Sequence, residues 1–338
     1  MPFQNPDNPH NLRAVGFSLA SFALFATHDA VIKFLGETYA PFQIIFFSSL
    51  LGFPLAMVWL MRDRSAATLI PVHPWWLTLR VVMGVVTAAC AFYAFSVLPL
   101  AQVYVFLFAS PFLITILSIP ILGERVGAHR WTAVALGFLG VIVALRPGNA
   151  DLGLGHLAGI TAAVTSAFAS IITRRIGKEE RSHVMVLYPM TANVLVMGAL
   201  LPFVYKPMPV EHLGLLALMA VLGFTALNLI VAAYRTGEAA IVAPMQYSQI
   251  FWGASYGALL FGDWPDGWTW AGVAIIIASG LYVVFREATA GTSREAPVST
   301  TKARPDAAPA MRIAASIRRA GDRVEPGHVA LAKARNTK

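Results

Sequence analysis

The chain has 338 residues, of which 57% are hydrophobic and only 12% are charged, with a formal net charge of +8. A soluble domain of this length carries charge on about a quarter of its residues, because water must wet its surface. The composition therefore excludes an ordinary soluble protein, and the basic residues form no stripe among aromatics that would indicate nucleic-acid binding.

Ten apolar runs are long enough to be spanning helices, which need about 20 mostly apolar residues with every backbone polar group bonded internally. The first run could instead be the apolar region of a signal peptide, but the nine later runs need a first span to set their phase. The predicted spans are Ala14–Leu35, Phe42–Met61, Trp75–Val97, Ala101–Leu122, Trp131–Leu145, Leu157–Thr173, Val184–Val204, Leu213–Tyr234, Ile241–Phe261 and Trp268–Phe285.

Lysine and arginine in the short loops orient the spans, because cytoplasmic loops are enriched in both. With the N-terminus inside, only Arg146 and Lys206 lie outside. Both termini are therefore predicted to be cytoplasmic, in a multi-pass protein of the inner membrane. The residues expected inside are Arg13, Arg62, Arg64, Arg125, Arg130, Arg174, Arg175, Lys178, Arg181, Arg235 and Arg286.

The two halves of the chain resemble each other. Leu122-Gly123-Glu124 followed by Trp131 matches Phe261-Gly262-Asp263 followed by Trp270, at a constant shift of 139 residues. Five helices per half is an odd number, so the second copy enters the membrane from the opposite side. We expect an all-α transmembrane bundle of two inverted five-helix repeats, with a solute site near mid-membrane between them.

This organisation divides the chain into five predicted segments. A cytoplasmic N-terminus (1–13) precedes the first repeat (14–146), and a linker (147–156) leads to the second repeat (157–286). The remaining 287–338 is basic and poor in aromatics, and we expect a disordered cytoplasmic tail.

Polar side chains inside spans are costly and mark candidate function. Asp29 and Lys33 are four residues apart in the first span, so they share a helix face and are predicted to pair. The pair could hold a charged solute or exchange a proton, or Lys33 could simply extend to the outer surface. His28 is interpreted as an interface residue, and Arg80 as a side chain extending to the inner boundary or, facing inward, an anion anchor.

Neutral polar residues give a second set of solute contacts, because amides and hydroxyls bind polar groups without the desolvation cost of a charge. Tyr93, Gln102, Gln246 and Gln249 are the candidates. Pro111 and Pro244 are predicted to permit helix bending for a gate, since each frees a backbone carbonyl. Ser110, Asn193 and Asn228 are interpreted as packing residues. Gly253 and Gly257 have a spacing that allows a homodimer.

Motifs of enzymes are absent: the sequence has no phosphate-binding Gly-rich loop, no H-E-x-x-H and no G-x-S-x-G. We expect no catalytic residue, no metal and no cofactor, and the single cysteine, Cys90, leaves no intrachain disulfide.

The first repeat resembles the EamA branch of the drug/metabolite transporter superfamily. The resemblance is carried by 93–101 (YAFSVLPLA), Ser110-Pro111, Leu122-Gly123-Glu124-Arg125, and 137–141 (GFLGV) ending at Arg146-Pro147. The second repeat matches more loosely, with Gly262-Asp263 where the family has Gly-Glu. The resemblance implies proton-linked or gradient-driven transport through a central cavity, with solutes such as S-adenosylmethionine, riboflavin or amino acids.

The function predicted is therefore secondary transport of a small organic metabolite by alternating access, with uptake and export both compatible. A membrane-embedded enzyme that modifies lipids or small molecules, using His28 and Asp29 as a base pair, is the rival of another class. A non-transporting membrane scaffold is the third interpretation.

Overall fold

The computed structural model describes residues 9–61, 69–124, 126–146, 153–177, 179–237 and 239–290, and the regular elements of this part of the chain are all helices, without strands. The predicted all-α bundle of ten membrane-crossing segments is confirmed. Its helices are α1 (Pro9–Gly36), α2 (Pro41–Met61), α3 (Pro74–Val97), α4 (Leu100–Leu122), α5 (Ala128–Leu145), α6 (Leu154–Ile176), α7 (Ser182–Val204), α8 (Val210–Thr236), α9 (Ala239–Val242), η1 (Ala243–Tyr247), α10 (Ser248–Phe261) and α11 (Gly267–Ala290).

The ninth predicted span is interrupted. It runs through α9, the 3-10 segment η1 and α10, so α10 alone has only 14 residues, and nine of the described helices are long enough to span by themselves. Pro244 lies in η1, where its missing N–H and its ring disfavour a regular α-helix. Pro111 lies inside α4, which continues through it. The two prolines therefore act differently on their helices.

The helices α4 and α10 end in the same way. Gly123 and Gly262 both have a φ of 71°, a left-handed conformation that glycine adopts without steric cost. After each glycine an acidic residue turns back to its helix: the Glu124 amide donates to the Ser118 carbonyl at 3.3 Å, and the Asp263 amide to the Gly257 carbonyl at 2.9 Å. The repeated Gly-acid pattern of the sequence is thus a repeated structural motif.

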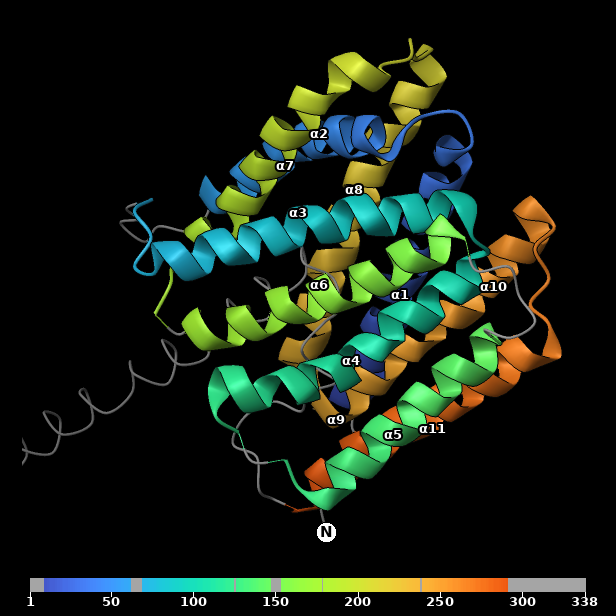
Figure 1. The fold of residues 1–338 in the computed structure, drawn as a ribbon. Coiled ribbons are helices and arrows are strands. Elements are labelled where there is room, and N and C mark those ends of the chain that lie inside the picture. Colours follow the sequence, from blue (N-terminus) through green and yellow to red (C-terminus); the bar gives the residue numbers. More distant parts are fainter. Residues whose placement is uncertain are drawn as a thin grey trace, which may run out of the picture.

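The last helices of the two repeats, α5 and α11, lie side by side at one edge of the bundle (Figure 1). They meet at Gly140 and Gly272, where an added Cβ on Gly140 would lie 2.8 Å from the Gly272 carbonyl oxygen. Gly253 and Gly137 instead accommodate the rings of Tyr104 and Phe112 within the same chain. Gly253, one of the two glycines behind the homodimer prediction, is therefore used for packing within the chain.

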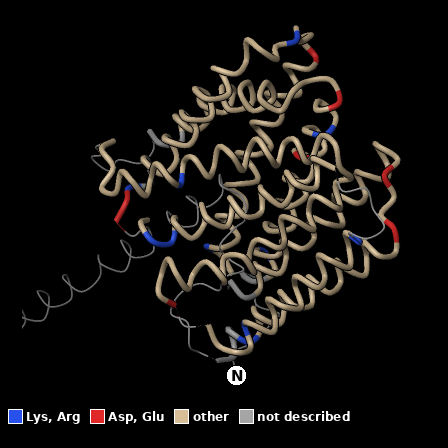
Figure 2. Tube along the Cα trace, viewed as in Figure 1, with Lys and Arg blue, Asp and Glu red and all other residues tan. Residues whose placement is uncertain are grey.

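Charged residues of the described part gather near the ends of the helices, and the middle of the bundle carries few (Figure 2). Large apolar side chains such as Phe203 and Leu259 are exposed on its outside, 84% and 78% respectively. An apolar belt between two charged ends is the surface expected for a protein in a bilayer. Asp29, Lys33 and Arg80 depart from this pattern because they are buried.

Some predictions concern residues outside the described part. They include most of the basic tail (287–338), which the structure describes only to residue 290, and part of the linker (147–156). Four of the orienting basic residues are also outside it: Arg62, Arg64, Arg125 and Lys178.

Candidate functional site

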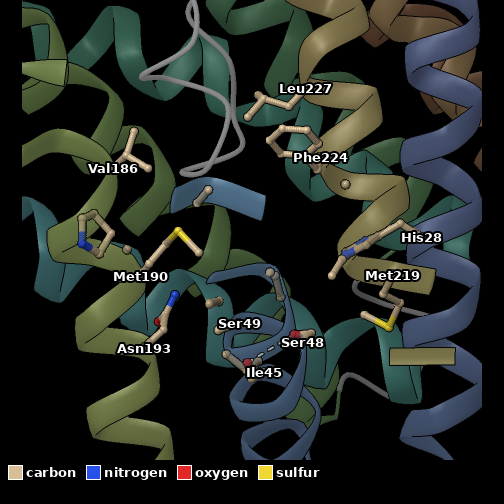
Figure 3. Close-up of a pocket in the computed structure, with 18 of the residues that line it drawn as sticks. His28, Ile45, Ser48, Ser49, Val186, Met190, Asn193, Met219, Phe224 and Leu227 are labelled. Atoms are coloured by element: carbon tan, nitrogen blue, oxygen red, sulfur yellow. Dashed lines mark hydrogen bonds between the residues drawn. The ribbon is translucent and has the colours of Figure 1, made fainter. Parts of the chain in front are cut away.

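A cavity of about 550 Å³ lies among α1, α2, α3, α7 and α8, with Leu107 of α4 also in its wall. This volume is in the range of pockets that bind metabolites. Both repeats line it, since α1 to α4 belong to the first and α7 and α8 to the second. Figure 3 shows His28 on one side of the cavity and Met190 and Asn193 on the other. Its polar lining residues are His28, Asp29, Ser48, Ser49, Thr87, Asn193, Asn228, Arg235 and Thr236.

Asp29 of α1 is the carboxylate in the cavity wall, and it is only 1% exposed. The Tyr104 hydroxyl of α4 donates to its Oδ2 at 2.8 Å, and Gln249 Nε2 of α10 lies 3.3 Å from the same oxygen. His28 Nδ1 lies 3.1 Å from Oδ1. Hydrogen bonds of this kind compensate a carboxylate for lost hydration. The carboxylate is thus held by groups from both repeats.

Glycine at position 253 makes the Tyr104 contact possible. The Tyr104 ring packs against α10 at Gly253, where an added Cβ would overlap the ring. The ring also stacks with Phe108 at a centroid distance of 6.1 Å. Tyr104 is fully buried, so its hydroxyl is directed to Asp29 by tight packing.

Lys33 does not form the predicted pair with Asp29. Its Nζ lies 2.8 Å from Asp263 Oδ2, beyond the end of α10, and donates to the Leu98 carbonyl at 2.8 Å. The Phe261 ring centroid is 5.2 Å from the same nitrogen, a cation–π distance. The pairing prediction was wrong because the long lysine side chain reaches toward the end of α1, where the second repeat supplies a carboxylate.

The remaining sequence candidates take different places. Gln249 contacts Asp29, as described, whereas Gln246 is buried in η1 outside the cavity wall. Tyr93 and Gln102 are half-buried and are not in the wall of this cavity. Of these candidates, Gln249 thus contacts Asp29, whereas Gln246, Tyr93 and Gln102 do not line the cavity.

Three residues interpreted as interface or packing residues lie in the cavity wall: His28, Asn193 and Asn228. Tyr104 and Asp263, which were not selected as site residues, contact Asp29 and Lys33. The available signal was polarity within an apolar span, which all but Asp263 share. Spacing alone did not indicate which helix face is directed to the cavity.

Arg80 of α3 is 3% exposed, so it does not extend to the membrane boundary. Its Nε donates to Thr173 Oγ1 at 2.7 Å and its Nη1 to the Met185 carbonyl at 3.2 Å. It binds α6 and α7 from inside the bundle and is outside the cavity wall. Arg80 thus connects the first repeat with the second.

A second ion pair between the repeats matches that of Lys33. Arg174 Nη2, near the end of α6, lies 2.7 Å from Glu124 Oε1, just beyond the end of α4. Glu124 and Asp263 are the acidic residues of the repeated Gly-acid motif. Because the repeats are inverted, the two pairs lie at opposite ends of the bundle, which we name the Lys33 end and the Arg174 end.

Loop contacts between the repeats accompany each ion pair. At the Lys33 end, Tyr39 Oη lies 2.7 Å from His212 Nδ1, and Gln43 Nε2 donates to the Lys206 carbonyl at 2.7 Å. At the Arg174 end, the His73 amide donates to Glu180 and its ring contacts Glu179. In this structure both ends of the bundle are bridged.

The chain matches a family model described as the EamA-like transporter family, at residues 12–146 and 153–285. The pseudopaline exporter CntI of Pseudomonas aeruginosa is 29% identical over 264 residues, covering 77% of this chain and 92% of the relative. The riboflavin transporter of Rhizobium johnstonii is 28% identical over 216 residues, covering 64% and 72%. The S-adenosylmethionine uptake transporter of Rickettsia bellii is 25% identical over 277 residues, covering 81% and 94%.

One crystal structure of a protein aligns with a TM-score of 0.57 at 18% identity, covering 83% of this chain and 99% of that chain, which supports the fold. The family and the named relatives are transporters of small molecules, not enzymes, so the rival interpretation as a membrane enzyme is not retained. The predicted resemblance to the EamA branch is confirmed by a match to both halves of the chain. This chain belongs to the EamA-like transporter family.

Proposed function

We propose that this protein is a secondary transporter that carries a small organic metabolite across the inner membrane by alternating access, through the cavity between its repeats. The observation that carries the proposal is Asp29, a buried carboxylate in the cavity wall whose donors come from both repeats. A relative movement of the repeats changes these contacts, so solute binding and movement are coupled at one residue.

The ion pairs at the two ends serve as alternating closures. Opening the Lys33 end requires Lys33 to separate from Asp263, and opening the Arg174 end requires Arg174 to separate from Glu124. Both pairs join one repeat to the other, so each breaks when the repeats rock apart at that end. Because the repeats are inverted, the same kind of ion pair occurs once at each end of the bundle.

Proton coupling is assigned to His28 and Asp29. Both residues line the cavity, and the side chain of His28 is 18% exposed whereas that of Asp29 is only 2% exposed. Their 3.1 Å contact allows a proton from the cavity to reach the carboxylate through the imidazole. Loss of the Asp29 charge weakens its bonds to Tyr104 and Gln249 and so favours movement.

The orientation follows from the charged loops, with both termini in the cytoplasm and the Arg174 end on the cytoplasmic side. Arg235 and Thr236, at the end of α8, extend the cavity wall toward that side. The named relatives carry pseudopaline, riboflavin and S-adenosylmethionine, which supports a small organic metabolite as the solute. These relatives include an exporter and an uptake transporter, and this proposal applies to either direction.

A flux measurement tests transport. The protein is reconstituted in liposomes with a proton gradient, and entry of labelled riboflavin, S-adenosylmethionine and a panel of amino acids is followed. Gradient-dependent flux of a panel member is expected, and Asp29→Asn should lower it by about tenfold or more. Gradient-independent flux removes the coupling, and absence of flux across the panel counts against the proposal and favours a membrane scaffold.

Alternating access is tested without knowledge of the solute. In a Cys90→Ala background, Ser49→Cys places a thiol in the cavity wall, and labelling by a membrane-impermeant reagent is followed from each side. Adding Lys33→Ala should raise labelling from the outside, and adding Arg174→Ala should raise it from the cytoplasmic side. Equal effects of both variants on both sides would show that the pairs are not closures.

A further inference from the structure

Gly223 of α8 leaves open space in the cavity wall beside His28. Within the described part of the chain, a Cβ added to Gly223 would approach only the His28 ring, whose Cδ2 would lie 3.8 Å away, an ordinary van der Waals distance. Both residues line the cavity. A side chain at position 223 would therefore extend into the cavity beside His28.

Gly52 of α2 leaves space in the same wall. A Cβ added to it would approach only Ala220 of α8, with 3.9 Å between the two Cβ atoms, among the described residues. Ala220 is three residues before Gly223, so the two share a face of α8. All three residues line the cavity. The absence of side chains at positions 52 and 223 thus widens the cavity where α1, α2 and α8 meet.

Several other helix glycines are covered by a neighbouring helix instead. A Cβ added to Gly159 would lie 2.5 Å from the Phe106 ring, and one added to Gly155 would lie 2.6 Å from the Val97 side chain. Glycines of this kind permit close helix packing. Gly223 has no such contact, so the space that it leaves is available to a solute.

The imidazole of His28 has one nitrogen available to a solute. Its Nδ1 is bonded to Asp29, and no contact within the part of the chain that the structure describes engages Nε2. Cδ2, the atom that faces Gly223, is bonded to Nε2 within the ring. A polar group of the solute that binds Nε2 therefore lies next to the open space at Gly223.

Apolar side chains surround this open space. The Phe92 and His28 rings are in edge contact at a centroid distance of 6.3 Å, and Met219 and Phe224 of α8 also line the cavity. Figure 3 shows Phe224 above and Met219 below His28 in its view. Aromatic and thioether groups contact ring faces favourably, and methionine adapts its shape to them. The space beside His28 therefore suits an apolar ring.

On the basis of the proposed transport function, we infer that Gly223, together with Gly52, is a specificity-determining residue, which leaves room for a ring of a solute whose polar group binds His28. The solute class assigned is an amphipathic metabolite in which a ring system is attached to a hydrogen-bonding group. A larger side chain at position 223 fills the space of the ring and so favours solutes without one.

Matched pairs of compounds test this inference by binding to the purified full-length protein in detergent. The pairs are riboflavin with ribitol, S-adenosylmethionine with S-methylmethionine, and phenylalanine with alanine; the second member keeps the polar part and lacks the ring system. We expect at least one ring-bearing compound to bind about tenfold or more tightly than its partner, because its ring leaves water. Gly223→Leu should reduce that ratio to within about threefold.

Gly214→Leu is the matched control, and the ratio should persist in it. Gly214 lies on the same helix, about two and a half turns before Gly223, so the two glycines face opposite sides of α8. Nothing described lies within 4 Å of a Cβ added to Gly214, and this residue is outside the cavity wall.

Gly223→Ala replaces Gly223→Leu if the leucine variant does not fold. It should lower the ratio by about threefold. It should also unfold at or above the wild-type temperature, because alanine stabilises a helix relative to glycine. Binding of no ring-bearing compound, equal binding within every pair, a ratio that survives the change at Gly223, or an equal loss in Gly214→Leu overturns the inference.

Failure of this inference and failure of the proposed function give different results. Flux of a compound without a ring, with none of the ring-bearing compounds bound, overturns the role of Gly223 and leaves transport intact. Binding with the expected ratio, lost in Gly223→Leu, but without flux across the membrane overturns transport and leaves the binding site intact.

Discussion

The interface of α1 with α10 and that of α6 with α4 occupy corresponding places in the two repeats. Each ends in an ion pair between repeats, Lys33 with Asp263 in one and Arg174 with Glu124 in the other. Their middles differ. Four residues before Lys33 stands Asp29, bonded to Gln249 of α10, whereas four residues before Arg174 stands Ser170.

This difference distinguishes the α4–α6 interface from the interface that we propose as part of the transport site. The α4–α6 interface has hydroxyl contacts in its middle, such as Ser110 Oγ to Ser166 Oγ at 3.1 Å, and it is among the most buried parts of the bundle. The α1–α10 interface has a carboxylate at the cavity wall and an interrupted helix opposite it. The two interfaces thus share an ion pair between the repeats, whereas only the α1–α10 interface has a carboxylate, that of Asp29, in its middle.

The strongest test of the comparison is Asp29→Asn. In this variant an amide N–H replaces one carboxylate oxygen and faces a group that donates a hydrogen bond to Asp29 in the wild type. Hydrogen bonds to a charged group are worth about 1.5–3 kcal/mol each. We expect gradient-driven flux in liposomes to fall by about tenfold or more. Ser170→Ala, at the matching position of the other repeat, should leave flux within about twofold; equal losses would show that the two interfaces are functionally alike.

Charge reversal tests the closures and should have the next largest effect. Lys33→Asp or Asp263→Lys alone should lower stability by about 1–2 kcal/mol, between the values for exposed and buried pairs, and the double variant should recover most of it. Thermal unfolding in detergent and flux measure the two effects.

Glu124→Arg and Arg174→Glu form the matched set at the other end. The Lys33 side chain is 10% exposed and that of Arg174 is 19%, and Lys33 also bonds to Leu98, so the Lys33 set should show the larger effect. Absence of recovery in both double variants would mean that the pairs do not act as closures.

The spans were predictable from sequence because hydrocarbon is a strict solvent, which requires long apolar helices and places charges at their ends. The repeat was predictable because Gly123 and Gly262 each need a left-handed turn. The partner of Lys33 could not be predicted, because a four-residue spacing indicates only neighbours on the same helix, whereas Asp263 approaches from the other repeat. The cavity position of Asn193 depends on the rotation of α7, which apolar periodicity leaves undetermined when lipid and protein both contact apolar faces.

A smaller effect on flux is expected from Gly253→Ala. The added methyl overlaps the Tyr104 ring, and overpacking of a tight contact costs about 1–3 kcal/mol. Displacement of the ring also moves its hydroxyl from Asp29, so flux should fall together with the unfolding temperature. Gly214→Ala is the control, because nothing lies near its added methyl, and this helical site should become up to about 1 kcal/mol more stable.

The smallest effect is expected from Ser110→Ala, in the middle of the α4–α6 interface. It removes the 3.1 Å contact with Ser166, and hydrogen bonds between membrane helices average about 0.6 kcal/mol. Stability in detergent should fall by about that amount, with flux within about threefold of wild type. Because the Ser166 hydroxyl also donates to the Ala163 carbonyl at 2.9 Å, it keeps a partner after the change. A loss of flux as large as that of Asp29→Asn, with normal stability, would place part of the solute pathway at this interface and remove the functional distinction between the two.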